Sequence, residues 1–229
     1  MTTVSTPTFP AAVLWDMDGT IVDTEPYWII AEQELVEIFG GEWTHEDGLA
    51  VVGQGLPVTA TRLQERGVAL SLDEIIQTLT SRVLEQLENS IPYRPGAAEL
   101  LEALSAAGVQ QGLVTMSIER MARRMADLIP GTPFSTVVAG DNVINSKPHP
   151  EAYLLAAQNL GVDIEQCLAF EDSPAGCRSA LSAGAVTVGI PHLVPLEDVP
   201  VTHILPSLLG VDPHHVAFLF TSATTKASA

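Results

Sequence analysis

The chain has 229 residues, and its 28 Asp and Glu against 10 Lys and Arg give a formal net charge of −18. This charge argues against a nucleic-acid partner and against an anionic membrane surface, because proteins bind both through clustered Lys and Arg. The composition is nevertheless 46% hydrophobic, so we expect a folded protein with a proper core rather than a disordered acidic chain.

The N-terminal residues 1–10 do not show the basic segment followed by an apolar one that marks a secretory signal. No apolar run in the chain approaches the roughly 18 residues that a membrane-spanning helix needs. We therefore expect a soluble cytoplasmic protein that begins with a flexible terminus. The short apolar run 11–15, AAVLW, then predicts a buried strand that stops at Asp16.

Residues 24–91 show helical patterns and no convincing strand. Pro26 suits the first turn of a helix, which Gly40-Gly41 ends. A second helix is predicted over 57–66, and a third after Ser71, where the sequence Ser-Leu-Asp-Glu has the spacing of a capping box. We expect 24–91 to form an all-helical domain that is inserted after the first strand.

Beyond residue 92, predicted strands alternate with predicted helices. The strands cover 109–116, 134–140, 167–170 and 185–190, and the helices cover 95–107, 119–129, 150–160 and 174–183. This alternation is typical of βαβ units with a buried parallel sheet. We therefore predict an α/β protein with a Rossmann-like three-layer core formed by 11–23 and 92–220. Residues 221–229, which are mostly polar, are expected to form a second flexible terminus.

Polar residues follow four of the predicted strands. They are Asp16 and Asp18, then Thr115 and Ser117 with Met116 between them, then Lys147, and finally Glu171 and Asp172. Each alone has an ordinary explanation, such as an Asp-Gly turn, a solvated lysine or acidic residues at a helix start. Because ligands of parallel sheets bind beyond the carboxyl ends of the strands, we expect these residues to converge at one edge. Lys147 is also one of only two lysines in the chain.

The chemistry that such a set supports is phosphoryl transfer. Carboxylates at two strand ends can hold Mg²⁺, which prefers oxygen ligands. One carboxylate, Asp16 or Asp18, can attack phosphorus while the other handles the proton of the leaving group. Lys147 and Thr115 would then orient and neutralise the phosphoryl oxygens.

The segments DMDGT, LVTMS, SKPHPEAY and FEDSPAG resemble, in this order, the four signature motifs of the haloacid dehalogenase superfamily. They are most similar to the branch of beta-phosphoglucomutases and sugar-phosphate phosphatases, which carry a small helical cap. The resemblance implies that Asp16 is the nucleophile and Asp18 the general acid and base. It implies phosphate binding by Thr115, Met116 and Lys147, and a Mg²⁺ site formed by Asp16, Asp172 and the main-chain carbonyl of Asp18. Glu171, Ser117, Gly19 and Glu25 are expected to support the site.

Departures from the family pattern separate the activities that the resemblance leaves open. Asp18 disfavours a dehalogenase, and the absence of lysine from 24–91 disfavours a phosphonate-cleaving enzyme. Beta-phosphoglucomutases hold the second phosphate with an arginine in a Gly-x-Ser-Arg setting, whereas this chain has 53–57, GQGLP, and its nearest arginine is Arg62. We therefore expect a phosphatase, with a hexose-phosphate mutase as the alternative. A binding protein without turnover is a third possibility.

The cap entry, Asp23-Thr24-Glu25-Pro26, also resembles that of sugar-phosphate phosphatases. Glu25 would then contact substrate hydroxyls or water, although a charge near a helix start explains it equally well. The predicted cap is strongly acidic, which discourages polyanions and favours a small phosphorylated metabolite. The predicted substrate is therefore a sugar or polyol monophosphate, acted on by a monomer or weak homodimer.

Overall fold

The structure is a computed structural model in which residues 8–51 and 55–227 are described, the last three as backbone only. The chain divides into two compact units. We call Met1–Val22 together with Tyr93–Ala229 the core unit, and Asp23–Pro92 the helical unit. Among the described residues, none of the helices combines the length and the apolar character that a membrane crossing requires.

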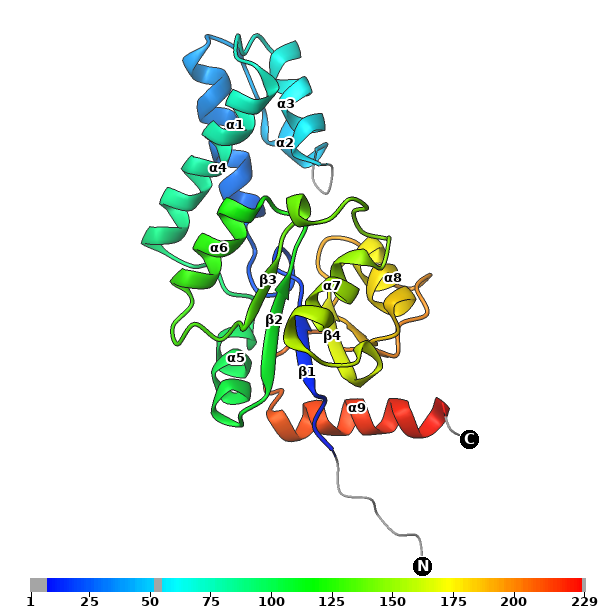
Figure 1. Cartoon of the computed structure of the whole chain (residues 1–229). Coiled ribbons are helices and arrows are strands. Elements are labelled where there is room, and N and C mark those ends of the chain that lie inside the picture. The colour runs from blue at the N-terminus through cyan, green and yellow to red at the C-terminus, as the bar shows by residue number, and fades with distance from the viewer. Residues whose placement is uncertain (1–7, 52–54, 228–229) are drawn as a thin grey trace, which may run out of the picture. The chain divides into compact units, whose positions relative to one another are not determined.

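The core unit is built on a parallel sheet with β1 near its centre (Figure 1). The strands are β1 (Ala12–Trp15), β2 (Gln110–Val114), β3 (Thr136–Val138), β4 (Cys167–Glu171), β5 (Val186–Gly189) and β6 (His203–Ile204), in the order β3-β2-β1-β4-β5-β6. Every residue of β1 is fully buried, as its apolar sequence predicts. The predicted parallel α/β sheet is confirmed.

Helices cover both faces of this sheet. They are α5 (Ala97–Ala106), α6 (Glu119–Leu128), α7 (Glu151–Leu160), α8 (Pro174–Ala183) and α9 (Pro213–Ala227), with two 3₁₀ helices, Gly140–Asn142 and Ile164–Gln166. Leu14 of β1 packs in a cluster with residues of α7 and α8. Its neighbour Trp15 points to the other face, where its indole N–H donates to Gln111, which in turn donates to the Leu101 carbonyl of α5. The core unit is thus a three-layer sandwich.

The helical unit contains α1 (Glu25–Ile38), α2 (His45–Leu49), α3 (Leu56–Glu65) and α4 (Leu72–Asn89). No strand occurs among its described residues, and α1 packs against α2 and α4. The capping box predicted at Ser71 is confirmed, since Ser71 and Glu74 exchange side-chain and backbone hydrogen bonds at the start of α4. Thr44 and Asp47 form a second, unpredicted capping box at the start of α2.

The expectation of a flexible C-terminus is wrong for residues 221–227, because α9 continues to Ala227. This helix buries Val216, Ala217 and Leu219. Apolar burial of this kind stabilises a helix whose later residues are mostly polar. The N-terminal segment that was expected to be flexible is also attached at its end, where the backbone N–H of Thr8 donates to the hydroxyl of Thr221 over 2.9 Å. Residues 1–7 and 228–229 lie outside the described part.

Candidate active site

The carboxyl ends of β1, β2 and β4 bring the polar residues of three motifs to one edge of the sheet. Trp15, the last residue of β1, pairs with Leu113 of β2 on one side and with Phe170 of β4 on the other. The residues that follow Trp15, Leu113 and Phe170 are therefore neighbours in space. Asp16 and Glu171 lie at two of these positions, and Thr115 comes one residue after the third, Val114, so the strand ends bring the three residues together as the sequence predicts.

Lys147 joins this group from the loop that precedes α7. Its ammonium nitrogen lies 2.8 Å from Asp16 Oδ1, 2.6 Å from Glu171 Oε1 and 2.9 Å from the Val114 carbonyl oxygen. Only 4% of its side chain is exposed. Burial lowers the pKa of Lys147, but the carboxylates of Asp16 and Glu171 outweigh it and raise this pKa above its ordinary value. The lysine is therefore a permanently charged group inside the site.

Three carboxylates crowd around Lys147. Ligand oxygens of Asp16, Glu171 and Asp172 all lie within 4.8 Å of one another. Burial, followed by the charge of Glu171, raises the pKa of Asp16 to about 7, although Lys147 lowers it in part. Burial, followed by the charges of Asp16 and Glu171, raises the pKa of Asp172 to about 9. One lysine does not offset the burial and mutual repulsion of three carboxylates, so the pKa values of Asp16 and Asp172 stay raised in its presence.

This donor set suits a hard divalent cation. Asp16 Oδ2 is buried and has no hydrogen-bond partner among the described residues. Burying an unpartnered carboxylate oxygen costs free energy unless a ligand such as a cation binds it. Oxygen donors from Asp16 and Asp172 are what Mg²⁺ and similar ions prefer. The side chain of Asp18 is not part of this cluster. The resemblance assigns the main-chain carbonyl of Asp18 to the metal, and that role stays a prediction.

The carboxylate of Asp18 is held by the residues that follow β2. The hydroxyl of Ser117 donates to Asp18 Oδ2 over 2.8 Å, and the Ser117 N–H donates to Thr115 Oγ1 over 3.0 Å. Gly19, which follows Asp18, has φ +89°, and a Cβ at this position would overlap the carboxylate of Asp172. Only glycine therefore permits the turn and the close approach of these two motifs.

Tyr153 lies beside the site although no pattern in the sequence marks it, apart from its place within the SKPHPEAY segment. It is fully buried on α7, and its hydroxyl donates to Glu171 Oε1 over 2.8 Å. Burial and the nearby carboxylates raise the pKa of Tyr153 well above its ordinary value, so the phenol stays protonated. A buried tyrosine needs a partner for its hydroxyl, so a tyrosine within a motif of the site was the feature of the sequence that could have pointed to this contact.

Two further predicted residues have less direct positions. The sulfur of Met116 accepts a hydrogen bond from the Lys147 N–H over 3.4 Å, so the structure places this residue beside the lysine. Glu25 is the first residue of α1 in the helical unit, where it adds to the negative charge near Glu32. The predicted contacts of both residues with a substrate stay predictions.

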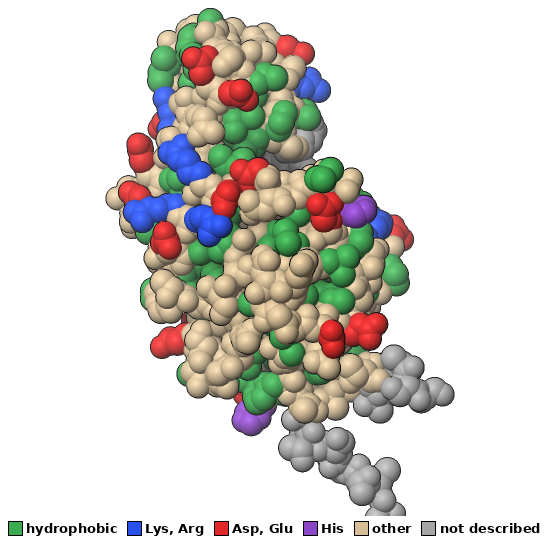
Figure 2. Space-filling model, in the orientation of Figure 1, with side chains coloured by type: hydrophobic (Ala, Val, Ile, Leu, Met, Phe, Trp, Pro, Cys, Tyr) green, Lys and Arg blue, Asp and Glu red, His purple; other side chains and the backbone are tan. Residues whose placement is uncertain are grey.

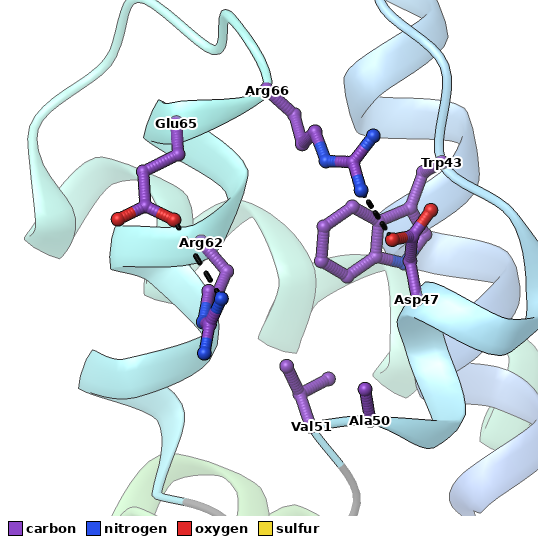
Figure 3. Close-up of a pocket in the computed structure, with 7 residues that line it drawn as sticks. All are labelled: Trp43, Asp47, Ala50, Val51, Arg62, Glu65 and Arg66. Carbon is purple, nitrogen blue, oxygen red and sulfur yellow. Dashed lines mark hydrogen bonds and ion pairs between the residues drawn. The ribbon is translucent and has the colours of Figure 1, made fainter.

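The helical unit has a small pocket of its own (Figure 3). It measures about 100 Å³ and is lined by Trp43, Asp47, Ala50, Val51, Arg62, Glu65 and Arg66. Arg66 pairs with Asp47, and Arg62 lies 3.9 Å from Glu65 at the surface. Arg62, the arginine nearest to the predicted loop, thus shares its pocket with two carboxylates. Residues 53 and 54 of that loop lie outside the described residues.

The chain is similar over most of its length to several curated proteins. It is 32% identical over 187 residues to the phosphorylated carbohydrates phosphatase of Thermotoga maritima, an alignment that covers 79% of this chain and 85% of that protein. It is 27% identical over 192 residues to hexitol phosphatase B of Escherichia coli, with 82% and 86% covered. Both relatives are thus similar to this chain over most of their length.

Solved structures and family models agree with this result. The crystal structure of CbbY from Rhodobacter sphaeroides in complex with phosphate matches with a TM-score of 0.78 at 25% identity, and the match covers 88% of this chain and 96% of that one. The family model described as haloacid dehalogenase-like hydrolase matches residues 13–190. The resemblance drawn from the four motifs is confirmed, and the chain belongs to the haloacid dehalogenase-like hydrolase family.

Proposed function

We propose that the protein is a Mg²⁺-dependent phosphatase that hydrolyses a small phosphate monoester, a sugar or polyol phosphate, through an aspartyl-phosphate on Asp16. The observation that carries this proposal is the environment of Asp16. One of its carboxylate oxygens bonds to Lys147, and the other is buried without a partner among the described residues. An anionic nucleophile held beside a fixed cation is suited to attack an electrophilic phosphorus.

In the first step, one carboxylate oxygen of Asp16 would form a bond to phosphorus while the bond to the leaving oxygen breaks. Asp18, which Ser117 orients, would give its proton to that leaving oxygen. Lys147 and the hydroxyl of Thr115 would hold the phosphoryl oxygens. In the second step, Asp18 would take a proton from water, whose oxygen attacks phosphorus and releases Asp16. A Mg²⁺ ion held by Asp16, Asp172 and the Asp18 carbonyl would supply the remaining neutralisation of charge.

The substrate class follows from charge and from the relatives. On the face drawn in Figure 2, basic side chains of the described residues gather toward the left edge and lie among carboxylates, and the whole chain has 28 acidic against 10 basic residues, so a long polyanion is an unfavourable ligand. Two of the relatives are named as phosphatases of carbohydrate and hexitol phosphates. We infer a small phosphorylated metabolite as substrate, with no nucleic-acid partner. A cytoplasmic monomer or weak homodimer completes the proposal.

Release of inorganic phosphate from a panel of sugar, polyol and nucleoside monophosphates tests this function. We expect turnover that needs Mg²⁺, that stops on chelation, and that Asp16→Asn abolishes. Asp198→Asn, the same change at an exposed aspartate of the core unit, serves as the control and should leave turnover unchanged. Phosphate release by Asp16→Asn at the wild-type rate would refute the nucleophile. Isomerisation of a 1-phosphosugar without free phosphate, in the presence of a bisphosphate primer, would instead indicate the mutase.

A further inference from the structure

Glu171 differs from Asp16 because both of its oxygens are occupied by donors of the protein, whereas Asp16 Oδ2 has no partner among the described residues. Oε1 accepts from Lys147 over 2.6 Å and from Tyr153 over 2.8 Å. Oε2 accepts from the Ser173 hydroxyl over 3.2 Å and lies 3.5 Å from the Ser173 N–H. A carboxylate offers about four acceptor sites, so these contacts take up most of its capacity. Glu171 is thereby fixed in place, with no exposed surface.

Gly176 contributes to this fixation from the first turn of α8. A Cβ at Gly176 would overlap the carboxylate of Glu171, so the helix backbone closes over the acid directly. The hydroxyl of Ser173 also accepts from the Gly176 N–H over 3.1 Å, which ties the start of the helix to the same acid. Glu171 therefore cannot move away from Lys147 without disturbing its contacts on α7 and α8.

Lys147 has in turn only three ammonium protons, and three acceptors surround it. Two of these acceptors, Glu171 Oε1 and the Val114 carbonyl, belong to a fixed carboxylate and to the backbone of β2. The third is Asp16 Oδ1. The ring of Tyr153 also lies beneath the ammonium, with the nitrogen 5.1 Å from its centre. The position of the lysine is thus set by Glu171 and the backbone on one side and by the aromatic ring on the other.

We propose that Tyr153 is a positioning residue for the phosphate-binding lysine: its hydroxyl fixes Glu171 as the anchor of Lys147 and leaves Asp16 and Asp172 to the metal. Tyr153 acts through Glu171 and touches neither substrate nor metal. This inference rests on the proposed phosphatase function. It divides the acidic cluster into an anchoring carboxylate, Glu171, and a metal-binding pair.

Tyr153→Phe isolates the hydroxyl, because the ring and its contact with the lysine remain. We expect KM for a phosphate ester to rise about tenfold with kcat changed less than threefold, since a misplaced lysine weakens the binding of phosphate in both ground and transition states. Tyr93→Phe is the matched control and should leave both constants unchanged, because the Tyr93 hydroxyl is buried and has no partner among the described residues. Wild-type KM in Tyr153→Phe would overturn the proposal.

A double-mutant cycle tests whether Tyr153 acts through Glu171. We expect Glu171→Gln to raise KM by itself, and Tyr153→Phe to add less than twofold in that background. Additive effects of the two changes would contradict the proposal. Glu171→Gln also keeps the test decisive if Tyr153→Phe fails to fold, because an unchanged KM in Glu171→Gln would refute the anchoring role.

A spectroscopic measurement separates this inference from the phosphatase function. Since the chain has only two lysines, labelling with ¹⁵N-lysine gives ammonium signals for Lys147 and Lys226 alone. We expect a slowly exchanging signal of Lys147 in the wild type that shifts or broadens in Tyr153→Phe, with the Lys226 signal as internal reference. An unchanged Lys147 signal would overturn the proposal. Absence of phosphate release by the wild type would refute the function and leave this measurement valid.

Discussion

Glu32 allows a test of the electrostatics of the helical unit that does not involve the active site. Its side chain is buried between α1 and α2 with 4% of the residue exposed, and one carboxyl oxygen accepts from the Trp43 indole N–H over 3.1 Å. Burial raises the pKa of Glu32 from about 4.5 to about 8, with a lowering by Trp43 and a further increase from the charge of Glu25. At neutral pH the folded protein therefore holds a proton that the unfolded chain releases.

The sign of the effect follows from this proton. Between about pH 4.5 and pH 8 the folded state binds more protons than the unfolded state, so the free energy of unfolding falls as pH rises through this window. At about 1.4 kcal/mol per pH unit, the window corresponds to at most about 4–5 kcal/mol. We expect Glu32 to change the free energy of unfolding by about 2–4 kcal/mol, less than this maximum, because it is not the only acid near α1. Glu32→Gln removes the titration and keeps an oxygen that can accept from Trp43.

Urea unfolding followed by tryptophan fluorescence, in a chelating buffer between pH 5 and pH 8.5, measures this effect. The two proteins should have similar stability near pH 5, and the variant should become the more stable one by about 2–4 kcal/mol at pH 8.5. Taking the difference between the proteins removes the contributions of Asp16 and Asp172, whose pKa values are also raised. A difference that stays constant with pH would refute the reasoning.

Three further substitutions test the packing of the site and the helical unit. Gly19→Ala should lower Mg²⁺-dependent phosphate release at least about tenfold, because the added Cβ would overlap the carboxylate of Asp172. Gly108 also has a positive φ but open space around it, so Gly108→Ala should lower the free energy of unfolding in urea by only about 1 kcal/mol. Lys147→Met should lower the stability of the metal-free protein by about 3–5 kcal/mol, and Mg²⁺ should restore part of it, while Lys226→Met serves as the control. Ser71→Ala should cost about 1 kcal/mol in urea unfolding through loss of the capping box, and an unchanged unfolding midpoint would contradict this.

Short local signals explain why much of the fold could be predicted. Glycines and prolines at the ends of helices, the capping box at Ser71 and the apolar runs of β1 and β4 each occupy a few consecutive residues. Two short elements were missed. The strand β6 has two residues and the helix α2 has five, which is too short for a periodic pattern. The mostly polar end of α9 was mistaken for a tail because its apolar residues lie earlier in the same helix.

The sequence by itself determined which residues we propose to carry the chemistry of this protein. Asp16, Asp18 and Asp172 closely follow the ends of β1 and β4, where a parallel sheet must bring them to one edge, and Lys147 lies further along, in the loop between β3 and α7. The tertiary structure alone decided which of these charged groups contact one another. Asp16 and Lys147 are 131 positions apart in the chain, and their contact depends on the loop before α7. The anchoring of Glu171 by Tyr153, and the burial that raises the pKa of Asp16, likewise depend on distances between segments, which no local pattern of residues encodes.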